Sequence, residues 1–190
     1  MKLLFISDIH GITNNLEYIT SLDSKENFDK VVVLGDLYYA GFTYDNEFEV
    51  NSLIVKDFLM NFKDRLICMR GNCDSDVDVK SSDFPICSNL SLLYVDSLDI
   101  YLSHGDEYSK YKNRKFDRKG VLVYGHEHIP YIEEIDDMVY ICVGSISLPR
   151  SGSRPSYMIY ENGKFIIYDI DREIVDFIEV MIWGNMNIVL

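Results

Sequence analysis

The chain contains four histidines, and each of them lies in a short polar motif of the kind that binds metal ions. Two further motifs of this kind add carboxylate and amide oxygens. The candidate ligands in these motifs are four imidazoles, two carboxylates and one amide, enough to hold two divalent cations. A pair of metal ions indicates a narrow set of reactions, mostly the hydrolysis of phosphate esters or amides. In chain order the motifs are Asp8-Ile9-His10, Gly35-Asp36, Gly71-Asn72-Cys73-Asp74, Ser103-His104-Gly105 and Gly125-His126-Glu127-His128.

Each motif directly follows a short apolar run, and such runs predict buried β-strands. Polar side chains just beyond the ends of buried strands meet in the crevice outside the sheet, where open α/β folds place their sites. We therefore expect the five motifs to converge on one site. The runs cover residues 3–6, 31–34, 66–69, 100–102 and 121–124.

The segments between the first three strands predict two helices, over residues 12–22 and 48–62. Apolar residues at helical spacing give each helix an inner face. These residues are Leu16, Ile19 and Leu22 in the first helix, and Leu53, Ile54, Phe58, Leu59 and Phe62 in the second. Two strand–helix–strand units imply a parallel sheet segment with right-handed crossovers.

From residue 86 onward the sequence predicts short, mainly antiparallel strands and little helix. Residues 131–143 indicate a hairpin that turns at Asp136-Asp137, and residues 157–170 indicate one that turns at Asn162-Gly163. A last strand is expected over residues 174–182. The predicted fold class is α/β, with two sheets packed face to face and helices outside.

The length of 190 residues is typical of a single domain, with a core over about residues 1–180 and no assignment for residues 183–190. The start of the chain is too quickly polar for a signal peptide, and no apolar run approaches the ~20 residues that span a bilayer. We expect a cytoplasmic protein without a membrane partner. The net charge of −13 also argues against non-specific binding of nucleic acid.

One local exception to the acidic composition is a basic cluster between the His104 and His126 motifs. It could steer a phosphate-bearing substrate toward the site, or it could be an ordinary solvated segment. Its members are Lys110, Lys112, Arg114, Lys115, Arg118 and Lys119. Of the four cysteines, Cys68, Cys87 and Cys142 fall in or beside apolar runs and are expected to be buried thiols.

Asp36 is the best candidate for a ligand that bridges two cations, because a carboxylate has two oxygens. Two groups of motif residues could complete the two sites. The first group is Asp8, His10 and His128, and the second is Asn72, His104 and His126. Such mixed oxygen and nitrogen donors suit Mn²⁺, Zn²⁺, Fe or Ni²⁺. A water shared by two such ions becomes hydroxide near neutral pH and can attack phosphorus.

The ordered set of five motifs resembles that of the calcineurin-like metallophosphoesterases, over the chain to about residue 180. The Gly71–Asp74 motif, with residues 122–126 and 144–150, is similar to the small bacterial and archaeal phosphodiesterases of the YfcE type. The resemblance implies a β-sandwich of mixed sheets flanked by helices, and metal-dependent hydrolysis of small phosphodiesters or phosphoesters. It also implies the two ligand groups given above, commonly loaded with Mn²⁺. A homo-oligomer is compatible with it.

The resemblance places Asp36, Asn72, Cys73 and His104 among the catalytic residues, but Cys73 departs from the family pattern. Many relatives have histidine at that position, where it is thought to protonate the leaving group. A thiol, with an ordinary pKa near 8.5, favours activated or diester substrates. The alternatives are that Cys73 binds metal, or that it is simply a small residue tolerated in a tight turn. Asp106 stands where close relatives have another histidine, and it could either orient a ligand or weaken anion binding.

The segment from Gly144 to Arg154 offers two arginines near the predicted site. Arg150 is our candidate for binding the phosphate of a substrate, because guanidinium presents a planar fork of donors. The alternative is a surface turn with solvated arginines. Arg154 precedes Pro155, so its backbone is expected to be extended.

Two other functions fit the same motifs less well. The first is a non-catalytic protein-interaction scaffold. A retromer subunit resembles this family and is regarded mainly as a protein-interaction module, and its metal ligands look partly replaced. Every ligand type is present in this chain. The second is a nuclease-type diesterase, against which the net charge and the lack of extra domains argue.

Overall fold

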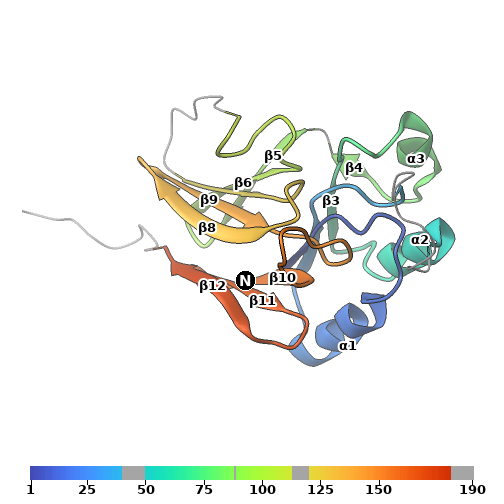
Figure 1. The fold of residues 1–190 in the computed structure, drawn as a ribbon, viewed down its shortest axis with the longest axis horizontal. Coiled ribbons are helices and arrows are strands. Elements are labelled where there is room, and N and C mark those ends of the chain that lie inside the picture. The colour runs from blue at the N-terminus through green and yellow to red at the C-terminus, as the bar shows by residue number, and fades with distance from the viewer. Residues whose placement is uncertain (40–49, 88, 113–119, 181–190) are drawn as a thin grey trace, which may run out of the picture.

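The structure is a computed structural model that describes residues 1–39, 50–87, 89–112 and 120–180 (Figure 1). Two β-sheets pack against each other, and the helices lie on one side of the pair. The described elements, in chain order, are β1 (Lys2–Ile6), α1 (Leu16–Glu26), β2 (Lys30–Val33), α2 (Ser52–Met60), β3 (Leu66–Met69), α3 (Asp76–Ser81), β4 (Ile86–Cys87), β5 (Leu90–Val95), β6 (Leu98–Ser103), β7 (Gly120–Tyr124), β8 (Pro130–Ile135), β9 (Met138–Val143), β10 (Ser156–Glu161), β11 (Lys164–Asp169) and β12 (Ile174–Glu179).

The first sheet has seven strands in the order β12-β11-β10-β1-β2-β3-β4. Its β1, β2 and β3 are parallel, as the two strand–helix–strand units predict. The hairpin of β10 and β11 returns to this sheet, where β10 pairs antiparallel with β1. The C-terminal strands therefore extend the N-terminal sheet.

The second sheet has five strands in the order β5-β6-β7-β9-β8. The expectation of mainly antiparallel pairing is wrong at its centre, because β7 runs parallel to both β6 and β9. The two edge pairs are antiparallel, and the hairpin of β8 and β9 turns at Asp136, as predicted. Both sheets are therefore mixed, which confirms the predicted fold class.

The main core lies between the two sheets, and the pleat of β1 shows how the sequence divides its apolar residues. Leu3 and Phe5 face the second sheet and pack with residues such as Val121 and Ile141. The alternate residues Leu4 and Ile6 belong to a second cluster that the helices cover. Because neighbouring residues of a strand point to opposite faces, an uninterrupted apolar strand serves both clusters.

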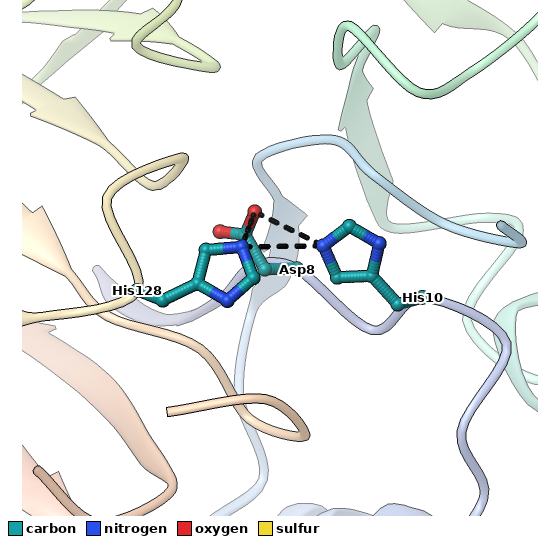
Figure 2. Close-up of side chains that lie close together, drawn as sticks. All are labelled: Asp8, His10 and His128. Carbon is teal, nitrogen blue, oxygen red and sulfur yellow. Dashed lines mark hydrogen bonds and ion pairs between the residues drawn. The ribbon is translucent and has the colours of Figure 1, made fainter. Parts of the chain in front are cut away.

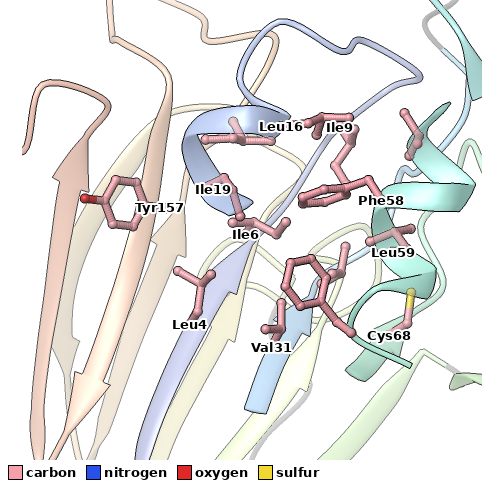
Figure 3. Packing of buried hydrophobic residues seen from close by; sticks show 14 of the residues in the cluster. Leu4, Ile6, Ile9, Leu16, Ile19, Val31, Phe58, Leu59, Cys68 and Tyr157 are labelled. Atoms are coloured by element: carbon pink, nitrogen blue, oxygen red, sulfur yellow. The ribbon is translucent and has the colours of Figure 1, made fainter. Parts of the chain in front are cut away.

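Helices α1 and α2 cover the outer face of the first sheet, where Leu16, Ile19, Phe58 and Leu59 pack beside Leu4 and Ile6 in the second cluster (Figure 3). The first helix begins later than predicted, at Leu16, and continues to Glu26. It ends at Asn27, whose left-handed backbone closes the last turn. No described helix covers the second sheet, so the expectation of outer helices holds for one sheet only.

Helix α2 is shorter than the predicted 48–62, and residues 40–49 lie outside the described part of the chain. The Asn51 side chain caps it by accepting the backbone N–H groups of the first turn. Two predicted inner residues are exposed, Leu53 by 73% and Ile54 by 42%. The buried face is Val55, Phe58, Leu59 and Phe62, which has the spacing i, i+3, i+4, i+7 of a single helix face.

The thiols of Cys68 and Cys142 are buried, and that of Cys87 is partly buried. Within the described ranges, no helix is long and apolar enough to cross a membrane. The basic cluster from Lys110 falls partly, and the segment 183–190 falls wholly, outside the described residues.

Candidate metal centre

The predicted ligands follow five strands drawn from both sheets. Three motifs follow β1, β2 and β3 of the first sheet, and two follow β6 and β7 of the second. Within each sheet these strands are mutually parallel, so their motifs lie at one end of that sheet. The contact of His128 with Asp8 shows that the two ends meet. The side chains meet between the two sheet edges.

The backbone of the ligand motifs is strained. Five of the seven predicted ligands are non-glycine residues with φ between 54° and 64°, a region that costs free energy for most side chains and that clusters at functional sites. They are Asp8, His10, Asp36, His126 and His128. Close backbone approach also requires glycine at two points. A Cβ at Gly71 would lie 2.2 Å from Asp36 Oδ1, and one at Gly125 would lie 1.9 Å from Ser7 Oγ.

The first group consists of Asp8, His10 and His128, which are buried (Figure 2). The Nδ1 atoms of His10 and His128 donate to the carbonyl oxygens of Tyr39 and Leu148. Because those carbonyls can only accept, each ring directs its Nε2 toward the group. The two Nε2 atoms are 3.2 Å apart, and His128 Nε2 is 3.1 Å from Asp8 Oδ1.

This first group needs a positive charge at its centre. Asp8 Oδ1 is buried and has no hydrogen-bond partner among the described residues, and the two Nε2 atoms present lone pairs to each other in neutral imidazoles. A divalent cation satisfies all three atoms. The carbonyl contacts of His10 and His128 are also typical of metal-binding histidines, which donate their other N–H to a backbone carbonyl or carboxylate. The donors present therefore fit a metal ion.

The second group surrounds His104. Its Nδ1 donates to the Leu34 carbonyl at 2.7 Å. Its Nε2 is 3.0 Å from Asn72 Oδ1, 3.2 Å from His126 Nδ1 and 3.4 Å from Asp36 Oδ2. One nitrogen, one amide oxygen and one carboxylate oxygen thus face His104 in a single small volume. The structure brings the residues of this predicted set together, and ligand atoms of Asp8, Asp36 and His104 also lie within 4.8 Å of one another.

Asp36 lies between the two groups. Its Oδ2 is 3.5 Å from His10 Nε2 and 3.4 Å from His104 Nε2. Its other oxygen, Oδ1, accepts the backbone N–H of Cys73 at 2.8 Å. One carboxylate oxygen therefore faces a histidine of each group, and the carboxylate has the position that a bridging ligand needs.

The electrostatics of the site favour bound positive charge. Burial alone would raise the pKa of the Asp8 and Asp36 carboxyls, but contacts with the histidines lower both pKa values. Burial also opposes protonation of His104, yet Asp36 and Asp8 outweigh it and raise the His104 pKa to about 9. The carboxylates thus stay ionised, and they attract a proton or a cation to the imidazoles.

Cys73 is half-buried beside this centre. Its Sγ lies 3.3 Å from Asn72 Nδ2, which donates to it. Its Sγ also lies within 4.8 Å of ligand atoms of His10 and Asp36. With the protein groups alone, burial and then the Asp36 carboxylate raise the pKa of the thiol to about 12, so it is protonated at neutral pH.

The sequence analysis missed the role of Asp74. Its buried carboxylate accepts three backbone N–H groups: those of Asp36 at 2.9 Å, Leu37 at 2.7 Å and Gly71 at 2.8 Å. It therefore ties the turn after β2 to the turn after β3, which carries Asn72. The only signal in the sequence was its place in the Gly71–Asp74 motif.

Ser145 was also missed, although its segment was singled out. Its Oγ donates to the Asp8 carbonyl at 2.8 Å and accepts the N–H of Leu148 at 2.7 Å. Leu148 in turn accepts from His128. Ser145 thus links the segment after β9 to both residues of the first group.

The predicted anion-binding residues have different surroundings. Arg150 is exposed, and its backbone N–H donates to the His128 carbonyl at 3.1 Å. Arg154 forms ion pairs with Asp169 and Asp171. Lys110 pairs with Glu133, so this member of the basic cluster is engaged in the fold. Asp106 is partly buried. Burial and the nearby His104 lower the pKa of His126, whereas the negative charge of Asp106 opposes this and favours the protonated ring.

Comparisons with known proteins agree with this architecture. Phosphodiesterase YfcE of Escherichia coli is 31% identical over 162 residues, which make up 85% of this chain and 88% of the relative. A solved structure of that phosphoesterase has a TM-score of 0.89 at 28% identity and covers 95% of this chain and 100% of that chain. A phosphodiesterase of Methanocaldococcus jannaschii is 25% identical over 156 residues, 76% of this chain and 83% of the relative.

Vps29 from Entamoeba histolytica, solved with Zn²⁺, shares the fold at a TM-score of 0.63 and 16% identity, and covers 94% of this chain and 99% of that chain. This likeness concerns the fold alone. The family model of the calcineurin-like phosphoesterase superfamily domain matches residues 1–164. The chain belongs to the calcineurin-like phosphoesterase superfamily.

Proposed function

We propose that the chain is a metal-dependent phosphodiesterase whose site holds two divalent cations. The observation that carries the proposal is the position of Asp36, whose Oδ2 faces His10 of one group at 3.5 Å and His104 of the other at 3.4 Å. Asp8, His10 and His128 would hold one ion, and Asn72, His104 and His126 would hold the other. The names of the relatives, which are phosphodiesterases, support this choice of reaction.

A pair of bound divalent ions supplies a water activated for attack on phosphorus and neutralises charge on the phosphoryl oxygens. The residues of this chain position the reaction. The carbonyls of Tyr39, Leu148 and Leu34 orient three imidazoles, so that Nε2 faces the centre. The amide of Asn72 lies beside His104 and could donate to a substrate oxygen. Arg150 is our candidate for a contact with the phosphate.

Cys73 bears on the choice of substrate. A thiol whose pKa is raised to about 12 is a weak proton donor, because efficient general acids have pKa values near the operating pH. Leaving groups that depart without a proton are therefore favoured, which supports activated esters, such as aryl phosphodiesters, over esters with poor leaving groups. The donors of the two groups are nitrogen and oxygen, which supports Mn²⁺, with Zn²⁺, Fe and Ni²⁺ as alternatives.

We also propose that residues 1–190 form one metallophosphoesterase domain and that it works in the cytoplasm on a small substrate. The family match over residues 1–164 supports the first point. For the second, the support is the acidic composition of the chain.

The test is hydrolysis of an aryl phosphodiester by protein that has been stripped of metal and then reloaded with Mn²⁺, Zn²⁺, Fe²⁺ or Ni²⁺. We expect turnover only after reloading, with about two ions bound per chain by elemental analysis. An aryl phosphomonoester serves as the matched substrate and should react more slowly. A protein that binds ions but turns over neither ester would be a scaffold, and the proposed activity would be wrong.

A further inference from the structure

The turn Gly125–His128 carries one predicted ligand of each metal group. His126 Nδ1 lies 3.2 Å from His104 Nε2 in the second group. His128 Nε2 lies 3.2 Å from His10 Nε2 in the first. Both histidines have left-handed backbones, with φ of 64° and 60°. Non-glycine residues hold such conformations only when the surrounding structure enforces them.

Glu127, between the two histidines, is joined to a chain of hydrogen bonds that runs away from the metal centre. Both of its carboxylate oxygens lie 3.0 Å from the hydroxyl of Tyr131, which donates to them. The Tyr131 oxygen also contacts the hydroxyl of Tyr124, and the backbone N–H of Lys110 donates to that hydroxyl at 3.3 Å. The Lys110 N–H can only donate, and the single hydroxyl proton of Tyr131 is donated to Glu127, so Tyr124 must donate to Tyr131. Every proton in this series of hydrogen bonds therefore points toward the Glu127 carboxylate.

The two tyrosines in this series of hydrogen bonds are held in place by the fold. Tyr124 is fully buried on β7, and Tyr131 lies on β8. The ammonium of Lys110 lies 3.8 Å from the centre of the Tyr131 ring, and it also pairs with Glu133 of the same strand. A cation over an aromatic face is attractive, so Lys110 restrains the ring whose hydroxyl holds Glu127.

We infer that Glu127 and Tyr131 are positioning residues that set the affinity of both metal ions together, an inference that rests on the function proposed above. Glu127 is tied to Tyr131, and the hydrogen bond holds the two flanking histidines in their left-handed conformations. Those conformations direct His126 to one ion and His128 to the other. Loss of the bond lets the turn relax, which moves one ligand of each group at once.

The test is calorimetric titration of metal-stripped protein with Mn²⁺, which resolves the two binding steps. Tyr131→Phe keeps the ring under Lys110 but removes the hydroxyl. We expect it to weaken both steps by about tenfold, the lower end of the range for partners of metal ligands. Glu127→Ala should do the same, whereas Glu127→Gln keeps an acceptor for Tyr131 and should restore most of the affinity.

Tyr140→Phe is the matched control, because Tyr140 is a tyrosine of the same sheet and the same apolar cluster. It should bind Mn²⁺ like the wild type. Weakening of only one step in Tyr131→Phe would overturn the coupling of the two ions, and unchanged affinity would overturn the positioning role. A lower unfolding temperature with unchanged affinity would also overturn it, since the bond would then be merely structural. Wild-type protein that binds no Mn²⁺ would instead contradict the proposed function.

Discussion

The Nε2 atoms of His10 and His128 lie 3.2 Å apart, although the two residues are separated by 118 positions in the chain. Each ring donates its other N–H to a backbone carbonyl, so neither neutral ring has a proton to share at this contact. A pair of acceptors at this distance is stable only when positive charge lies beside it. The nearby Asp8 and Asp36 carboxylates attract that charge, which is either a proton or a metal ion.

Competition between protons and metal predicts a pH dependence. The pKa of His104 is raised to about 9, so a metal ion must displace a proton from this ring at neutral pH. Apparent Mn²⁺ affinity should rise as pH increases from 6.5 to 9 and then level off. Titration calorimetry in two buffers of different ionisation enthalpy checks this by counting the released protons.

The stability of the metal-free protein should change in the opposite direction. A histidine whose folded pKa is raised contributes stability that is complete below its unfolded pKa of ~6.5 and is lost as pH rises through its folded pKa. Metal-free protein should therefore become less stable between pH 6.5 and 9, while stabilisation by Mn²⁺ grows. Mn²⁺ affinity that does not vary across this range would contradict the assignment of His104 as a ligand.

Asp36 should be required for both ions, because its Oδ2 lies 3.5 Å from His10 Nε2 of one group and 3.4 Å from His104 Nε2 of the other. We expect Asp36→Ala to lose both ions, whereas Asp8→Ala should mainly weaken the first site. Elemental analysis after desalting measures the stoichiometry, and circular dichroism serves to check that each variant is folded. Two ions retained per chain in Asp36→Ala would show that the carboxylate does not bridge.

Asp74 should support the site without touching a metal. Its carboxylate accepts three buried N–H groups with its two oxygens. An asparagine would keep one of these oxygens, and its NH₂ group would face backbone N–H groups that need an acceptor. We expect Asp74→Asn to lower the free energy of unfolding by about 1–3 kcal/mol per donor left unpaired, and to weaken metal binding. Urea denaturation with EDTA present isolates the first effect.

The matched control for this change is Asp76→Asn. Asp76 lies two residues away, and its side chain is 75% exposed and paired with Arg70. Because exposed ion pairs contribute little, this variant should keep the stability of the wild type. Equal losses in the two variants would mean that the loop is sensitive to any change of charge.

The sequence predicted the ligand motifs and their strands because both are local patterns. An apolar run followed by a polar motif specifies a strand and the residue at its end, whatever the strand pairs with. The pairing itself is not local: nothing in residues 156–161 indicates that β10 lies beside β1. The parallel pairing of β7 with β9 was missed for the same reason.

Hydrogen bonds between a side chain and backbone far away in the sequence could not be predicted either. Asp74 accepts from Asp36, 38 positions away, and Ser145 donates to Asp8, 137 positions away. Periodicity placed Leu53 and Ile54 on the inner face of a helix, but the choice between overlapping apolar stripes depends on the sheet beneath. Val55, rather than either of them, occupies that face.

Cys73 should set the preference for diesters. Imidazole, with a pKa near 6.5, is a better matched proton donor at neutral pH than this thiol. Cys73→His is therefore expected to keep its metal content and to improve turnover of phosphomonoesters relative to diesters. In Cys73→Ser the metal content should be unchanged, and loss of one ion would show instead that the thiol is a ligand.

Arg150 and Arg154 form a natural pair of variants for testing phosphate recognition. Arg154 is held by Asp169 and Asp171, whereas the backbone of Arg150 is joined to the ligand His128. We expect Arg150→Ala to lower kcat/KM for diesters, with metal content and folding intact. The loss of transition-state stabilisation should be ~1.5–3 kcal/mol, the range for hydrogen bonds to charged groups. Arg154→Ala should keep wild-type kinetics, because its guanidinium already faces two carboxylates. Wild-type kinetics on several diesters in Arg150→Ala would assign that side chain to the solvated surface and would leave the amide of Asn72 as the remaining candidate donor to phosphate.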